Sequence, residues 1–139
     1  MSTLHEKVKA ELANIEEVIS ALSSIDTSRT ITKIETAGIA AYLHSFYNGI
    51  ENILKQIFIN YSWEIPQSES WHKDLLSEAL KHKVVSESLK KKMIKFLGFR
   101  HFFIHNYGFK LDISELNVLL EDLPFVIKKF KSDIKKWIE

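Results

Sequence analysis

One short stretch, FRHFFIHNYG, gathers reactive side chains in an otherwise apolar segment. Its polar members are Arg100, His101, His105, Asn106 and Tyr107, and Arg100 is one of only two arginines in the chain. Arginine stays charged and its planar guanidinium matches the oxygens of a phosphate. Histidine takes or gives a proton near neutral pH. Together these groups suit metal-free cleavage of an RNA phosphodiester: a base draws the proton from the ribose 2′-hydroxyl, and arginine stabilises the charge on the phosphate.

The spacing of these residues limits how they can cooperate. On a helix, His101 and His105 lie one turn apart on the same face. Arg100 and His105 are separated by about 140° around the helix axis, which a long arginine side chain can span. The reaction also needs an acid for the leaving 5′-oxygen, and one chain offers a single well-placed histidine, His105, with His101 as a weaker second. A two-fold dimer would supply both roles, so we expect a homodimer.

Two other interpretations of these residues stay open. His101 and His105 could hold zinc, but HFFIH lacks the glutamate of the H-E-x-x-H motif and no acidic third ligand is close in sequence. We therefore expect no metal and no cofactor. In a purely structural interpretation, the imidazoles bond backbone groups and Arg100 pairs with a buried acid, for which Glu51 is a candidate.

Helical periodicity dominates the rest of the chain, which has only four glycines and two prolines. The segment SWEIPQSES is the clearest loop, and Pro124 predicts a kink or restart in the last helix. The pattern predicts an all-α bundle of four to five helices in a single domain, residues 1–139. The expected helices cover residues 3–23, 30–61, 71–81, 86–108 and 112 to the C-terminal region.

Charge is unevenly distributed, although the net charge is only +1. Residues 1–80 carry six Lys/Arg against eleven Asp/Glu, whereas residues 81–110 carry eight against the single Glu87. A lysine run is often just a solvated helix face. Because this run leads into the arginine and histidines, we interpret Lys90, Lys91, Lys92 and Lys95 as an RNA-binding footprint.

The composition indicates neither a secreted, disulfide-bonded protein nor a membrane protein. The chain has no cysteine, which excludes disulfides and thiolate metal sites. The N-terminal residues mix charge into every turn, unlike a signal peptide. No apolar run approaches the roughly 18 residues that span a bilayer. We therefore expect a cytoplasmic protein with no membrane association.

Arg100-x4-His105-x-Tyr107 resembles the R-x4-H-x-Y signature of the HepT-like toxins of the HEPN superfamily. His101 is an acceptable variant of the polar residue that usually follows the arginine. The segment YLHSFYNGIENILKQIF (42–58) resembles the family's long second helix. The resemblance covers most of the chain and implies a HEPN-type bundle.

The resemblance also implies an activity and a partner. HEPN toxins are homodimeric, metal-independent endoribonucleases whose motifs line one cleft. By position, Arg100 would stabilise the scissile phosphate, His105 would be the acid/base, and His101 and Asn106 would support them. The implied substrate is RNA, either tRNA or mRNA. The implied partner is an MNT-type nucleotidyltransferase antitoxin, which in some pairs transfers AMP to the motif tyrosine, here Tyr107.

Two rival functions share this fold. The first is a non-catalytic HEPN module that binds a nucleotide or a nucleotidyltransferase partner. The second is a generic helical interaction protein. The complete set of arginine, histidine and tyrosine favours the enzyme, because a scaffold does not need all three.

Overall fold

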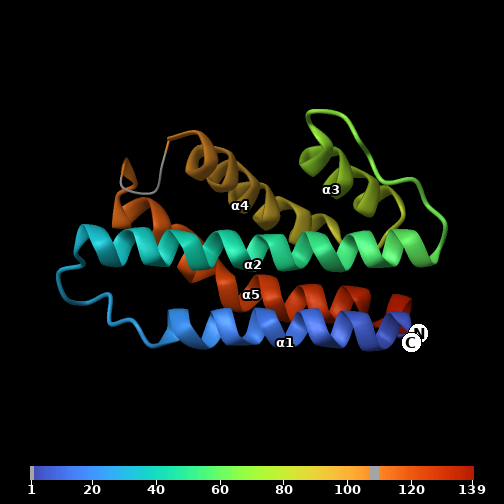
Figure 1. Cartoon of the computed structure of the whole chain (residues 1–139), viewed down its shortest axis with the longest axis horizontal. Helices are drawn as coiled ribbons and strands as arrows, with labels where there is room; N and C mark the ends of the chain where they lie inside the picture. The colour runs from blue at the N-terminus through green and yellow to red at the C-terminus, as the bar shows by residue number, and fades with distance from the viewer. Residues whose placement is uncertain (1, 107–109) are drawn as a thin grey trace.

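The computed structural model describes residues 2–106 and 110–139, and this part of the chain forms five helices and no strand (Figure 1). The helices are α1 (Leu4–Ser23), α2 (Lys33–Asn60), α3 (Trp71–Lys81), α4 (Glu87–Asn106) and α5 (Ile113–Ile138). The predicted all-α bundle is confirmed.

The long helix α2 is the centre of the bundle, because it contacts each of the other four helices. α1 runs antiparallel along one side of α2, and α5 packs against both (Figure 1). α3 and α4 lie together along another side of α2. α1 begins and α5 ends at the same end of the bundle (Figure 1). This arrangement brings His72, at the beginning of α3, and Arg100, in the C-terminal half of α4, to the same residue of α2, Glu51.

Capping side chains set where the helices begin. Thr32 and Glu35 form a reciprocal capping box at the start of α2, which begins at Lys33 rather than near residue 30. Ser86 accepts a hydrogen bond from the Leu89 backbone N–H at 3.3 Å and so caps α4, as its sequence position predicts. The Ser86 N–H donates to Asp133 Oδ2 at 2.9 Å, which fixes the start of α4 against α5.

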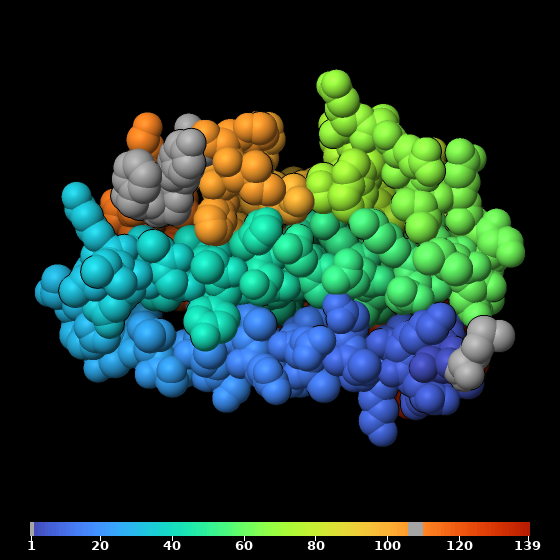
Figure 2. All heavy atoms as spheres, viewed as in Figure 1, coloured from blue at the N-terminus to red at the C-terminus, as the bar shows by residue number. Residues whose placement is uncertain are grey.

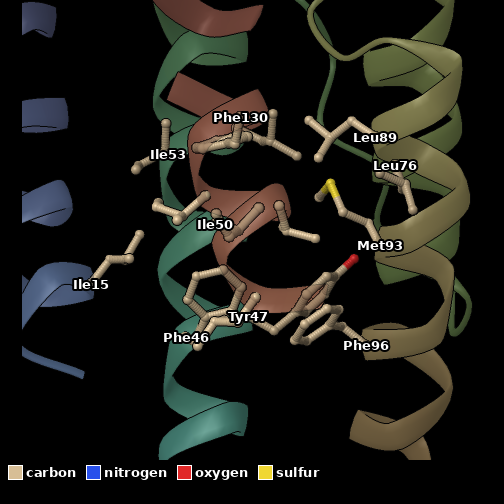
Figure 3. Close-up of a cluster of buried hydrophobic side chains, with 14 of the residues drawn as sticks. Ile15, Phe46, Tyr47, Ile50, Ile53, Leu76, Leu89, Met93, Phe96 and Phe130 are labelled. Carbon is tan, nitrogen blue, oxygen red and sulfur yellow. The ribbon is translucent and has the colours of Figure 1, made fainter. Parts of the chain in front are cut away.

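The hydrophobic core takes side chains from all five helices (Figure 3). The apolar positions of α2 that recur at steps of three and four are buried, including Leu43, Phe46, Ile50 and Ile57. Tyr47 packs among them and stacks on Phe96 of α4, with ring centroids 6.5 Å apart. No described helix is long and apolar enough to cross a membrane.

Two helix positions carry unusual residues. Gly49 of α2 faces α1 so closely that a Cβ there would lie 2.6 Å from Ile15 Cγ1. Pro124 lies inside α5, which continues through it as one element from Ile113 to Ile138. The last helix therefore does not restart at the proline.

Candidate active site

A hollow of about 530 Å³ lies between the beginning of α3 and the C-terminal half of α4. Figure 2 shows it as the recess between the yellow-green α3 and the orange part of α4. We call it the α3–α4 hollow. The residues with charged or titratable side chains that line it are Arg100, His101, His105, His72, Lys73 and Glu69. The arginine and both histidines singled out by the sequence therefore reach one cavity.

Arg100 of α4 forms an ion pair with a buried acid of α2, Glu51. Its Nε lies 4.0 Å from Glu51 Oε1, an ion pair in which the glutamate side chain is 4% exposed and that of Arg100 18% exposed. This separation is too long for a hydrogen bond, and the buried Nε of Arg100 has no hydrogen-bond partner among the described residues. The predicted pairing of Arg100 with Glu51 is confirmed as a charge contact. Glu51 therefore holds the guanidinium near the hollow without accepting a hydrogen bond from its Nε.

Glu51 has a second and closer partner, His72 of α3. His72 Nδ1 lies 2.7 Å from Glu51 Oε2. Burial raises the pKa of Glu51 to about 7, although the positive charges of Arg100 and Lys55 oppose this rise. Burial also lowers the pKa of His72 to about 4, and Arg100 and Lys55 act in the same direction. Carboxyl and imidazole thus form one coupled pair.

The protonation of this pair decides how much charge Arg100 offers to a ligand. A neutral carboxyl beside a neutral imidazole, and a carboxylate beside an imidazolium, hold the same number of protons and both have no net charge. Below about pH 7, where Glu51 is protonated or His72 is charged, the pair does not cancel the guanidinium. Arg100 then remains an uncompensated cation beside the hollow, which favours an anionic ligand.

His101 and His105 lie on the outer wall of the hollow, and both are exposed. Their ring centroids are 4.5 Å apart, as expected for neighbours one turn apart. Neither imidazole hydrogen-bonds to a described residue, so the structural interpretation of backbone-bonded histidines does not apply to the described part of the chain. Within residues 2–106 and 110–139, no group of three His, Cys, Asp or Glu side chains comes together in a way that could hold a metal ion.

Two histidines near Arg100 were not identified from the sequence. His72 lies 21 residues from Glu51 along the chain and reaches it only because α3 folds back on α2. His44 of α2 packs edge-on against Phe103, with ring centroids 5.2 Å apart. Burial, Arg100 and His72 lower the pKa of His44. No local pattern marks either residue, because their neighbours come from other helices.

The predicted RNA-binding lysines do not line the α3–α4 hollow. Lys92 and Lys95 turn toward α5, where their Nζ atoms lie 3.0 and 3.3 Å from the two carboxylate oxygens of Asp122. Lys90 is half-buried and Lys91 is exposed. By helical spacing, Lys91 continues the row formed by Ile94, Gly98, His101 and His105.

The remaining predicted residues lie at the end of α4. Asn106 is its last residue. Tyr107, the predicted AMP acceptor, lies outside the described residues, as does Gly108, the expected helix stop.

Comparison with known proteins gives one match, to a family model. No curated protein and no solved structure matches the chain. One family model, described as HepT-like protein, matches residues 38–139, which include most of α2 and all of α3, α4 and α5. The match covers well over half of the chain and contains Glu51, His72, Arg100 and His105. The chain therefore belongs to the HepT-like family of HEPN-type proteins.

Proposed function

We propose that this protein is the toxin of a HEPN/MNT toxin–antitoxin pair and acts as a metal-independent endoribonuclease. The observation that carries the proposal is that Arg100 and His105 line one hollow although they lie on different faces of α4. A permanent cation and a titratable imidazole at one cavity are the groups that phosphodiester transesterification requires. The family membership supports the same activity.

The proposed reaction proceeds by attack of the neighbouring ribose oxygen. A base removes the 2′-hydroxyl proton, and the 2′-oxygen bonds to phosphorus. The bond from phosphorus to the 5′-oxygen breaks, and an acid protonates that oxygen. Arg100 stabilises the charge on the non-bridging phosphate oxygens, and His105 transfers a proton. The products are a 2′,3′-cyclic phosphate and a 5′-hydroxyl end, with no other co-reactant.

We propose that the protein works as a homodimer. Ile94 and Ile104 of α4 line the hollow and are 51% and 48% exposed. Gly98 lies between them, and a Cβ there would meet no atom of the described residues within 4 Å. An exposed apolar face around a small residue supports close packing against a second α4.

We also propose that an MNT-type nucleotidyltransferase neutralises the toxin by transferring AMP to Tyr107. In the sequence Tyr107 comes two residues after His105, and a phosphate-bearing group added to it would bring bulk and negative charge that oppose RNA binding. The RNA substrate, tRNA or mRNA, would be repelled by that charge.

Growth inhibition on induced expression tests the activity in cells. Wild type should arrest growth, and Arg100→Ala and His105→Ala should each relieve the arrest at equal protein level. Co-expressing the partner transferase should also relieve it and add the mass of AMP to wild type but not to Tyr107→Phe. Two toxic alanine variants would refute the catalytic assignment, and an unmodified wild type in the presence of active transferase would refute the AMPylation.

A further inference from the structure

The α3–α4 hollow contains a second histidine with the surroundings of a proton-transfer group. His72 of α3 lines the hollow together with Arg100 and His105. Its Nδ1 is held at 2.7 Å by Oε2 of Glu51, whose side chain is 4% exposed. A buried carboxylate on one ring nitrogen fixes the tautomer and orientation of an imidazole, and it leaves the other nitrogen, Nε2, for a substrate.

We propose that His72 is the proton acceptor of this site, with Glu51 as its positioning residue and His105 as the proton donor. This inference rests on the proposed ribonuclease function. His72 Nε2 takes the proton of the 2′-hydroxyl as the 2′-oxygen bonds to phosphorus. His105 gives its proton to the 5′-oxygen as the bond between phosphorus and that oxygen breaks. Water returns both histidines to their starting states.

The environment of His72 keeps its ring neutral, which is the form that can accept a proton. Burial, together with Arg100 and Lys55, lowers the pKa of His72 to about 4, so its ring is neutral near pH 7. The proton acquired during the reaction is then stabilised by the Glu51 carboxylate, which accepts the Nδ1–H. His101 lacks such a partner, since no hydrogen bond joins it to a described residue.

The protonation state of Glu51 controls this arrangement. When Glu51 is ionised, Nδ1–H donates to it and Nε2 has a free lone pair. When Glu51 is protonated, its hydroxyl donates to Nδ1 and Nε2 carries the hydrogen, so the ring cannot accept. The other titratable or charged groups that face the pair or line the hollow are Arg100, Lys55, His44, Tyr47, Lys73, Glu69, His101 and His105.

One consequence concerns the dimer. If His72 and His105 of one chain supply both proton transfers, each chain contains a complete site, and the second copy need not contribute its histidine. The expectation that a dimer must combine two copies of His105 would then be unnecessary for the chemistry.

Single-turnover cleavage of unfractionated bacterial tRNA in EDTA tests the proposal. The full-length variants are His72→Gln and Glu51→Gln, with His82→Gln as the matched control. His82 is also half-buried but stacks on Trp63, with ring centroids 3.7 Å apart, and does not line the hollow. Circular dichroism and thermal melting establish that each variant is folded. His72→Gln should lower the maximal rate by about 100-fold or more with the half-saturating tRNA concentration nearly unchanged, and His82→Gln should match wild type.

Two further readouts separate chemistry from structural support. The wild-type rate should rise with pH as Glu51 ionises, near its pKa of about 7. Glu51→Gln should be slower, because the amide N–H of glutamine can donate to Nδ1 and leave the hydrogen on Nε2. It should also lose this rise, because the amide does not ionise. Added imidazole should raise the cleavage rate of His72→Ala at least tenfold and should leave the rate of Arg100→Ala unchanged. If His72 only supported packing, imidazole would not raise the rate.

The outcomes distinguish this inference from the function on which it rests. If wild type cleaves and a folded His72→Gln stays within threefold of it with the same pH profile, His72 is not the acceptor and the ribonuclease proposal survives. If His72→Gln does not fold, the imidazole response and the Glu51→Gln pH profile decide, and the absence of both effects overturns the inference. If wild type does not cleave RNA, both proposals are wrong.

Discussion

At the scale of single residues, Glu51 connects the two groups on which the site depends. One carboxylate oxygen contacts the Arg100 guanidinium and the other bonds to His72. Because the pKa shifts of Glu51 and His72 have opposite directions, they have opposite effects on how stability changes with pH. In wild type the two contributions to the pH dependence of stability therefore cancel in part. A variant of either residue should show the contribution of the other.

The sign for each residue follows from proton uptake. Between about pH 4.5 and 7, Glu51 binds more protons when folded than when unfolded, so its contribution to stability falls as pH rises. Between about pH 4 and 6.5, His72 binds fewer protons when folded, so its contribution rises with pH. Over pH 5 to 6.5 the two slopes oppose each other.

We predict that Glu51→Gln and His72→Gln change the pH dependence of unfolding in opposite directions. Relative to wild type, the free energy of unfolding of Glu51→Gln should increase from pH 5 to 6.5, and that of His72→Gln should decrease, each by about 1–2 kcal/mol. Urea titrations at several pH values measure this. Parallel curves for wild type and both variants would mean that the pair does not titrate as described.

The candidate site was partly predictable at this scale. Arg100, His105 and the candidate partner Glu51 could be found from the sequence, because a fixed helical spacing and an acid within an apolar row are local signals. His72 could not, since its contact with Glu51 depends on the angle at which α3 packs on α2 and α4.

At the scale of elements, the starts of three helices could be predicted from the sequence. Side-chain caps at Thr3, Ser86 and Asp112 mark the starts of α1, α4 and α5, and each is visible in the sequence. The restart of the last helix that Pro124 suggested does not occur, because α5 runs from Ile113 to Ile138 as one helix. Proline removes one backbone hydrogen bond, but Leu123, Val126 and Ile127 on both sides of Pro124 are buried, and this packing keeps the helix intact.

Two helical glycines should respond in opposite ways to alanine. At Gly49 a Cβ would lie 2.6 Å from Ile15 Cγ1, so Gly49→Ala should displace the buried Ile15 side chain and destabilise the fold by about 1–3 kcal/mol. At Gly98 a Cβ meets nothing within 4 Å, so Gly98→Ala should stabilise the isolated chain by up to about 1 kcal/mol. Urea unfolding of both variants measures this. Equal effects of the two substitutions would contradict the close approach at Gly49.

The two faces of α4 should also differ in RNA binding. Hydrogen bonds from Lys92 and Lys95 lower the pKa of Asp122, although burial acts in the other direction, and these two lysines are already paired. Lys91 is exposed and lies on the row that leads to His101 and His105. We predict that Lys91→Ala reduces the slope of log affinity against log salt by about 0.7, and that Lys95→Ala reduces it much less.

Fluorescence anisotropy with labelled tRNA at several salt concentrations measures these slopes, using His105→Ala as the background so that the RNA stays intact. A larger effect for Lys95→Ala would place the RNA path along the face of α4 that contacts α5.

At the scale of the whole molecule, the exposed apolar side chains around the hollow determine the expected assembly. Ile94 and Ile104 flank Gly98 on the surface of α4. We predict that wild type sediments as a dimer and that Ile94→Lys sediments as a monomer, because a lysine would be desolvated in the interface. Ile59→Lys is the control, because Ile59 is 58% exposed but lies on α2, away from the hollow. A dimeric Ile94→Lys, or a monomeric wild type, would refute an interface at this face.

The most direct test of the ribonuclease proposal is the chemistry of the RNA ends. Purified, unmodified protein is incubated with total RNA in EDTA beside His105→Ala, and the fragment ends are identified by mass spectrometry. The proposal predicts 2′,3′-cyclic phosphate and 5′-hydroxyl ends with wild type and no fragments with the variant. Intact RNA in both samples, or fragments with 3′-hydroxyl and 5′-phosphate ends, would contradict it.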